Sequence, residues 1–405
     1  MTILGSLRSI ALSLSLACAG LGCASESSYL LPNAPYALPD FPGEAARIDG
    51  IVCSLPIEGR RTSLAEAMRR FRVPGVSAAA MVDGRIVWAR GFGSADPARN
   101  LPMRPETVLQ AASISKAVTA VGVMRLVEKG ELWLDADVRE LVDDWEPSLG
   151  GRPARITLRQ LLSHSAGLNV HGFRGYATTD PERIPSTLSV LLGKGNSPAV
   201  RLEAPPGTRT TYSGGGFTVV QAAIEEELDL SFATVMRRYL LGPFGMKRST
   251  FEQPLSPDNA RFAGPGFDAQ GRMVEGGWHT YPEQAAAGLW TTPVDLLTLA
   301  SGLIRGFHGL PAPLSRAAVS AMLTPQSTDG AFGLGWVVKP RGQVIEAMHN
   351  GGNAGYSTML VWRTDGFGAV AMANGEGPVA AALVDAIAEA YGWRKLQAKG
   401  NGCRR

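Results

Sequence analysis

The pattern of apolar positions predicts strands near both ends of the chain. Residues 75–93 form two apolar runs joined by Asp83-Gly84, and such a dipeptide between two apolar runs indicates a tight hairpin. Further runs with strand character are residues 332–340, 356–366 and 367–375. Strands this far apart in the sequence indicate one sheet that is built from distant parts of the chain.

The middle of the chain has the spacing of short helices instead. These are residues 157–168, 217–228 and 232–245. A closing helix is expected at 378–392, where Pro378 stands in the first turn and Gly392 just past the end. We therefore predict an α+β fold with an antiparallel sheet flanked by helices. Its α/β lobe is expected to comprise residues 51–140 and 266–397, with a mostly helical lobe, residues 141–265, inserted between them.

The first 23 residues are typical of an export signal. Arg8 precedes an apolar run at residues 9–22, which is shorter than the roughly 20 residues that a membrane span needs. Gly22-Cys23 resembles the end of a lipoprotein signal, and cleavage after Ala19 is the alternative. We expect the protein to be exported to the bacterial periplasm or, through a lipid on Cys23, to be anchored to the outer membrane.

A proline-rich segment follows the signal. Residues 24–50, with prolines at 32, 35, 39 and 42, predict an extended tether without a core of its own. Beyond the signal two cysteines remain, Cys53 and Cys403, and the sequence leaves open whether they pair.

Composition limits the classes of partner. The 405 residues are 45% hydrophobic and 19% charged, which is ordinary for a globular protein. The net charge of +3 is too small to indicate nucleic acid or an anionic membrane surface as a partner. Lysine occurs only seven times, so a lysine in an apolar segment stands out.

One such lysine lies in the apolar stretch 110–130, three residues after a serine. Ser113 and Lys116 would lie on one face of a helix, about 5–6 Å apart between their Cβ atoms. At the first turn of that helix, free N–H groups favour negative charge on Ser113, and apolar surroundings disfavour a charged ammonium on Lys116. The two residues can therefore be a nucleophile and its base. On the pattern alone the alternative is favoured, in which Ser113 caps the helix and Lys116 extends to solvent.

Further segments change this balance, because several of them occur in a characteristic order. They are residues 73–96, 112–135, 156–168, 205–221, 286–297, 332–338 and 349–358. In these segments the chain resembles the serine β-lactamase and penicillin-binding protein family, in particular its class C, DD-peptidase and family VIII esterase branch. The resemblance implies the β-lactamase/transpeptidase-like fold, an acyl-enzyme mechanism, and neither a cofactor nor a metal.

The resemblance also implies a role for each matching residue. Ser113 would attack a carbonyl group, and Lys116 would take or relay its proton. Tyr212 matches the tyrosine of the Tyr-x-Asn motif and would shuttle a proton to the leaving group. His349 and Gly351 match the Lys/His-x-Gly motif. The backbone N–H groups of Ser113 and of Gly352 would hold the oxyanion.

Two departures from the family pattern bear on the substrate. Tyr-x-Asn is here Tyr212-Ser213-Gly214, so the amide that would hold an acylamide group is missing, although Asn353 could replace it. The third motif carries His349 in place of a lysine, and histidine titrates near neutrality instead of staying charged. Both departures favour a small ester or amide over a β-lactam as the substrate.

Two alternatives remain at the level of the sequence. One is a DD-peptidase, penicillin-binding or β-lactamase activity on peptidoglycan peptides or β-lactams, and the other is a binding module for the cell wall or a ligand that has lost turnover. His164 is expected to be structural. His279 and Trp278 could line the pocket or pack a loop, and the sequence does not decide between these roles.

Overall fold

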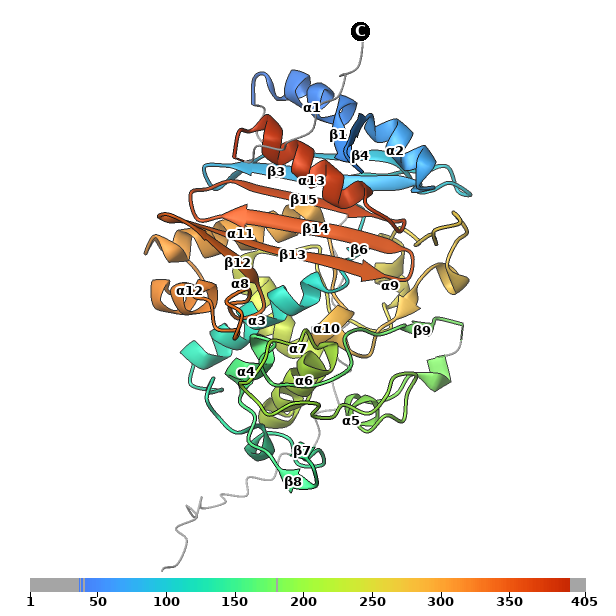
Figure 1. The fold of residues 1–405 in the computed structure, drawn as a ribbon. Helices are drawn as coiled ribbons and strands as arrows, with labels where there is room; N and C mark the ends of the chain where they lie inside the picture. The colour runs from blue at the N-terminus through green and yellow to red at the C-terminus, as the bar shows by residue number, and fades with distance from the viewer. Residues whose placement is uncertain (1–35, 37, 39–40, 180, 394–405) are drawn as a thin grey trace, which may run out of the picture. The chain divides into compact units, whose positions relative to one another are not determined.

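Seven antiparallel strands form one sheet that combines both ends of the chain (Figure 1). The structure, a computed structural model, describes residues 36, 38, 41–179 and 181–393. The strands are, in spatial order, β12 (Val337–Arg341), β13 (Val344–Asn353), β14 (Tyr356–Arg363), β15 (Gly368–Ala373), β3 (Gly75–Val82), β4 (Arg85–Asp96) and β5 (Leu101–Pro102). The predicted hairpin at Asp83-Gly84 and the predicted sheet from distant segments are both confirmed.

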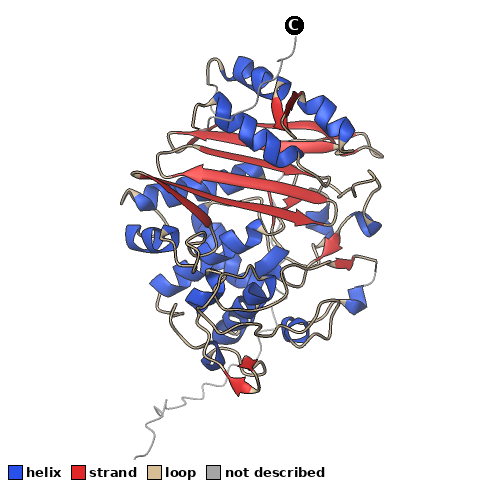
Figure 2. Cartoon of the chain, in the orientation of Figure 1, coloured by secondary structure: helices blue, strands red, loops and turns tan. Residues whose placement is uncertain are grey.

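Strict alternation along the strands gives the sheet two buried faces. On β14, Leu360 and Trp362 face one hydrophobic cluster, whereas Met359 and Val361 face the other. Because side chains in a strand alternate with a period of two, one apolar run serves both clusters. Figure 2 shows helices on both sides of the sheet.

The helices divide between the two faces. The first cluster includes residues of α3 (Ile114–Glu128), α11 (Pro293–Phe307) and α12 (Arg316–Leu323). The second includes residues of α1 (Glu44–Cys53), α2 (Leu64–Arg70) and α13 (Val379–Ala390). Nearly every residue of α3 is buried, and its last turn is its most exposed part. A helix that is apolar on all sides is typical of a protein core.

The predicted helical segment contains mainly short helices. These are α4 (Leu158–Leu162), α5 (Thr187–Leu191), α6 (Gly214–Leu228), α7 (Phe232–Met236), α8 (Gly242–Phe244) and α9 (Pro257–Ala260). The chain then continues into α10 (Gln284–Ala287), which packs against both α3 and α6. The remaining strands pair two by two: β1 (Leu55–Ile57) with β2 (Arg60–Thr62), β6 (Leu109–Gln110) with β11 (Trp290–Thr291), β7 (Ser148–Leu149) with β8 (Arg152–Pro153), and β9 (Tyr176–Ala177) with β10 (His279–Thr280).

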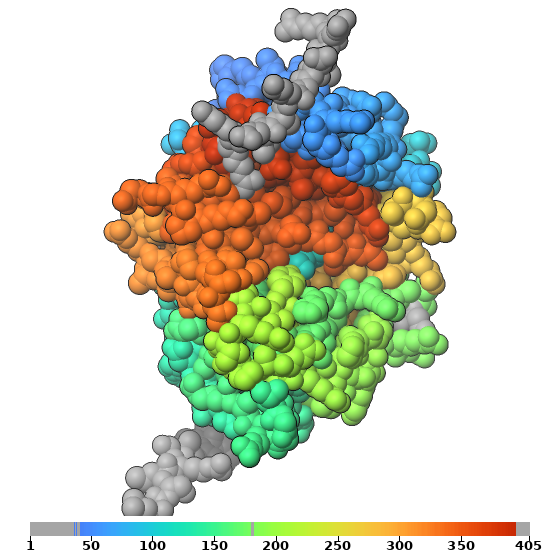
Figure 3. Space-filling model, in the orientation of Figure 1, coloured from blue at the N-terminus to red at the C-terminus, as the bar shows by residue number. Residues whose placement is uncertain are grey.

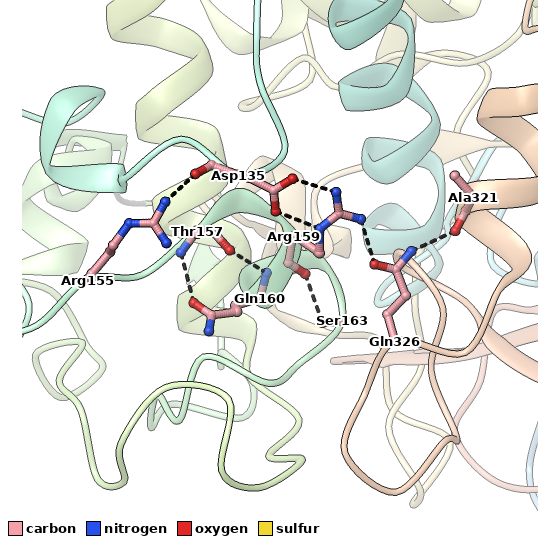
Figure 4. Close-up of polar contacts among 8 residues, drawn as sticks. All are labelled: Asp135, Arg155, Thr157, Arg159, Gln160, Ser163, Ala321 and Gln326. Carbon is pink, nitrogen blue, oxygen red and sulfur yellow. Dashed lines mark hydrogen bonds and ion pairs between the residues drawn. The ribbon is translucent and has the colours of Figure 1, made fainter.

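A polar network holds the short helix α4 (Figure 4). The Arg159 guanidinium donates to both oxygens of Asp135 at 2.7 Å and to Gln326 Oε1 at 2.9 Å. Thr157 and Gln160 cap the N-terminus of α4 reciprocally. The network fixes the loop that follows α4, and that loop carries His164.

Two predicted boundaries are wrong. The strand expected at 332–340 begins only at Val337, because Gly335 has a φ of +76° and its backbone lies against α3. A Cβ atom at Gly335 would lie 2.4 Å from the Cβ of Ala120, so the chain turns here and Phe332 pairs back with Val337 in an isolated bridge. The helix expected at 157–168 ends at Leu162.

The N-terminal tether also differs from a free linker where the structure describes it. Residues 44–53, at its end, form α1. The Tyr36 hydroxyl is hydrogen-bonded to Thr292 Oγ1 at 2.6 Å and donates to Asp295 Oδ1 at 3.1 Å, so this residue is attached to the start of α11.

Several expectations concern residues outside the described part of the chain. The export signal at 1–23 and the lipid on Cys23 stay predictions for this reason, and whether Cys53 pairs with Cys403 stays open, because Cys403 lies outside the described residues. In the ranges that the structure does describe, none of the helices combines the length and the apolar character needed to span a bilayer.

Candidate active site

The turn before α3 presents Ser113 at the start of that helix. Ala112 has a φ of +49°, in the left-handed region that non-glycine residues seldom adopt. Strand β6 precedes this turn and pairs with β11, and the Ala111 N–H donates to Leu289 O at 2.8 Å. The Ser113 side chain makes no capping hydrogen bond, which leaves its oxygen available for other contacts. Left-handed backbone at non-glycine residues is concentrated at functional sites.

Lys116 is buried and bonds directly to Ser113. Its side chain is only 1% exposed, and Nζ donates to Ser113 Oγ at 3.1 Å and to Ala286 O, in α10, at 2.8 Å. In the described part of the chain no carboxylate lies within ion-pair distance of Nζ. The alternative in which Lys116 extends to solvent is therefore wrong, and the amine is held where it can exchange a proton with the serine hydroxyl.

Strand β13 comes unusually close to the Ser113 turn. A Cβ atom on Gly351 would lie 2.4 Å from Ala111 O and 2.9 Å from the Cβ of Ala112. Thr358, the cross-strand neighbour of Gly351 on β14, donates its hydroxyl to Ala111 O at 3.0 Å. Only glycine permits this approach, which brings the following residue, Gly352, to the edge of the site. Figure 3 shows a small cyan patch of chain, in the colour of the segment that leads into α3, between the orange-to-red strands and the green helical segment.

Tyr212 lies on the other side of Lys116. The centroid of its ring is 5.0 Å from Lys116 Nζ and 4.4 Å from the ring centroid of His164. His164 also holds the backbone there, because its Nδ1 accepts from the Ser213 N–H at 3.1 Å and its carbonyl oxygen accepts from the Thr211 N–H at 2.7 Å. The expectation that His164 is structural agrees with these contacts, and they show that it positions Tyr212.

His349 is neutral in this site. Its Nδ1 lies 2.7 Å from Asn350 O, and since a carbonyl oxygen only accepts, Nδ1 carries the proton and Nε2 is an acceptor. Burial, aided by the positive charge of Lys116, lowers the pKa of His349 to about 4. Burial and the charge of Lys116 also lower the pKa of His164 well below the ordinary histidine value. The expectation of a group that titrates near neutrality at the third motif is therefore wrong.

The second motif folds as the start of α6. Ser213 Oγ donates to Asn169 O at 2.6 Å and accepts from the Gly216 N–H at 2.9 Å, so its hydroxyl caps the helix. A Cβ atom on Gly214 would lie 2.9 Å from the ring of Phe173. The structure thus gives Ser213 and Gly214 structural contacts, and no side chain at 214 points to the substrate.

Asn353 is the last residue of β13, beside the site, and its side-chain oxygen Oδ1 is available for a further hydrogen bond. Its Nδ2 donates to Gln110 Oε1 at 2.7 Å and to Ala287 O at 3.1 Å. Among the described residues no hydrogen bond uses its Oδ1, so this oxygen can accept from a substrate N–H. Gln110 in turn donates to His279 O at 2.7 Å and connects this corner to β10.

The residues left undecided by the sequence pack a loop beside the site. His279 Nδ1 is bonded to Arg174 O at 2.8 Å, and the Trp278 ring lies edge-on to Trp290 at 5.4 Å between centroids. The sequence did not single out Thr358, Gln110 or Asn169, because each acts through a residue more than 40 positions away. Across the described residues no cluster of three His, Cys, Asp or Glu side chains could hold a metal ion.

The arrangement is that of an acyl-transfer site, with a serine, a buried lysine and a tyrosine in contact. A sequence profile described as Beta-lactamase matches residues 61–392, most of the chain. The chain belongs to the β-lactamase family. It is thus a member of a family of serine hydrolases, which includes esterases and peptidases.

Two relatives show the breadth of this family. Penicillin-binding protein 4* of Bacillus subtilis is 25% identical over 299 residues, which cover 69% of this chain and 63% of the relative. Esterase EstB of Burkholderia gladioli is 29% identical over 215 residues, 52% of this chain and 54% of the relative. The chain thus spans less than two thirds of either relative.

Similar solved structures support the fold. The octameric penicillin-binding protein homologue from Pyrococcus abyssi has a TM-score of 0.65 at 24% identity, covering 81% of this chain and 76% of that one. SurE with D-Leu has a TM-score of 0.63 at 26% identity, covering 85% of this chain and 76% of that one. The β-lactamase/transpeptidase-like fold expected from the sequence is confirmed.

Gly351→Ala should disable the site while leaving the fold intact. The added methyl must push β13 away from Ala111, and an error of about 1 Å at a reacting centre can cost about 100-fold in rate. Gly50→Ala is the matched control, since Gly50 lies in α1, away from the site, and nothing lies within 4 Å of its added methyl. Ester hydrolysis by the two purified variants gives the comparison. Equal kcat/KM for both would contradict the close approach.

His349→Asn should change how stability depends on pH. A folded-state pKa of about 4 lies below the unfolded value of about 6.5, so the unfolded chain binds the extra proton between these values and stability falls as pH falls. From pH 7.5 to pH 5 the wild type should lose about 2 kcal/mol relative to the variant. Urea unfolding at several pH values measures this. Parallel curves for the two proteins would rule out a buried, neutral His349.

Proposed function

We propose that this protein is an esterase-like serine hydrolase that acts on small, uncharged esters or amides. The observation that carries the proposal is the neutral His349, whose Nε2 is buried and, among the described residues, has no hydrogen-bond partner. A substrate carboxylate at this position would meet an acceptor nitrogen instead of a permanent cation, which disfavours its binding. The relative EstB, whose name describes an esterase, supports the same class.

Acylation can be followed atom by atom in this geometry. Ser113 Oγ attacks the carbonyl carbon, and its proton passes to the amine of Lys116, whose Nζ lies 3.1 Å away. The carbonyl oxygen becomes an oxyanion that the N–H groups of Ser113 and Gly352 would hold. Each of these donors would lower the activation barrier by about 2.7–4 kcal/mol. The tetrahedral intermediate then breaks the bond to the leaving group. Tyr212 passes that group a proton, and Lys116 restores the proton of Tyr212.

Deacylation reverses these roles. A water molecule takes the place of the leaving group, attacks the acyl carbon and gives a proton to Lys116, either directly or through Tyr212, which passes its own proton to Lys116. The ester bond to Ser113 breaks, the acid leaves, and the proton returns to Ser113 Oγ. The imidazole rings of His164 and His349 stay neutral throughout, because burial and the charge of Lys116 disfavour the imidazolium form.

Ser113→Ala should abolish turnover and covalent modification together. Intact mass is measured after brief exposure of the full chain to p-nitrophenyl butyrate or to benzylpenicillin, with Ser113→Ala as the control. We expect a transient butyryl adduct in the wild type and none in the variant. A long-lived penicillin adduct without an ester adduct would favour a wall peptidase, and no adduct in folded protein would favour the binding module.

A second candidate is a peptidase or β-lactam-binding activity, and Asn353 is the observation that favours it. Its available Oδ1 could accept from the N–H of an acylamide side chain, which penicillins and stem peptides both carry. Penicillin-binding protein 4* as a relative agrees with this candidate.

His349→Lys tests which substrate class the third motif selects. The new ammonium can form a charge-assisted hydrogen bond with a substrate carboxylate, worth about 1.5–3 kcal/mol. The acylation rate with benzylpenicillin should therefore rise at least tenfold relative to the rate with p-nitrophenyl butyrate. Stopped-flow acylation of wild type and variant measures this ratio, and an unchanged ratio would show that His349 does not set the preference.

A further inference from the structure

A cavity lies apart from Ser113, toward the opposite edge of the sheet. It has a volume of about 1030 Å³ and lies between the C-terminal end of α1, helix α2, strand β4 and the turn at 270–271. We call it the α2 cavity. Strands β14, β15 and β3 separate β4 from β13, so at the usual strand spacing the cavity is ~19 Å from the third motif. Cavities of about 300–1,000 Å³ commonly bind small ligands.

The walls of the α2 cavity are mainly apolar. They include Val52, Leu64, Met68, Val73, Pro74 and Phe92. Two polar atoms of the wall are already in use: Ser63 Oγ accepts from the Glu66 N–H at 3.2 Å, and Pro74 O accepts from the Ser94 N–H at 2.8 Å. The wall has one side-chain amide, Gln270, at the exposed turn. A peptide or a sugar would bury its polar groups here with few partners, which is costly. The walls therefore favour an alkyl chain.

The charged side chains at the cavity have one sign. Arg69 and Arg72 line it and are exposed, and among the described residues neither forms an ion pair, whereas their neighbour Arg70 pairs with Glu58. Acidic side chains are absent from its lining in the described part of the chain. Two unpaired guanidinium groups beside an apolar cavity complement a carboxylate at the end of an alkyl chain.

We propose that the α2 cavity is a binding site for a long-chain fatty acid. The alkyl chain lies against Leu64, Met68 and Phe92, and the carboxylate bonds to Arg69 and Arg72. This site is separate from the Ser113 site and does not depend on the proposed esterase activity.

The test is calorimetric titration of the full chain with dodecanoate, dodecanol and dodecyltrimethylammonium, each below its micellar concentration. We expect dodecanoate to bind at least tenfold more tightly than the cation. Arg69→Glu and Arg72→Glu should each weaken dodecanoate binding at least tenfold. Arg85→Glu is the matched control, because Arg85 is exposed at the start of β4 and does not line the cavity, and it should bind like the wild type.

Ala65→Trp adds a test that does not rely on charge. Ala65 is an exposed position of α2 that lines the cavity, so the indole can fill it without entering the core. We expect loss of dodecanoate binding with unchanged melting temperature and unchanged hydrolysis of p-nitrophenyl butyrate. Unchanged binding in this variant, or competition between dodecanoate and the ester, would assign the fatty acid to the Ser113 site and overturn the proposal. A dimer that Ala65→Trp disrupts, without dodecanoate binding, would instead assign the cavity to a second copy of the chain.

Discussion

The buried amine of Lys116 is the constraint on which the rest of the site depends. It lies inside the core with two hydrogen bonds, to Ser113 Oγ and to Ala286 O, and without a carboxylate partner in the described part of the chain. A buried amine has no water to satisfy it, so the surrounding groups must supply its hydrogen bonds and hold it rigidly. Helix α3 is therefore packed on every side, and α10 is fixed where its carbonyl oxygen meets the amine.

The same requirement explains why β13 and the Ser113 turn meet so closely. Gly351 lets the strand approach the backbone at Ala111, and Thr358 ties the two segments together with one hydroxyl. Acyl transfer needs hydrogen-bond donors within about 3 Å of the oxyanion. A contact between two backbone segments positions such donors more accurately than a contact between long side chains. The site is thus built mainly from main-chain geometry, with Lys116 and Tyr212 added to it.

How much the sequence predicts depends on how local each feature is. The spacing of Ser113 and Lys116 is local to one helix, and the hairpin at Asp83-Gly84 is local to one turn, so both could be predicted. Tyr212 could be found only through the family resemblance. The neutral state of His349 could not be predicted at all, because it results from burial and from a charge 233 positions earlier in the chain. The predicted start of the strand at residue 332 was wrong for the same reason, because contact with α3 causes the turn at Gly335.

These long-range effects also decide the charge balance of the site. Burial and the charge of Lys116 disfavour protonation of both His164 and His349, so neither ring adds a positive charge to this site. Negative charge that develops in the transition state is then met by one amine and by backbone N–H groups. A substrate that brings its own carboxylate competes for that amine and deprives Ser113 of its base. The distribution of charge therefore supports the proposed preference for neutral substrates.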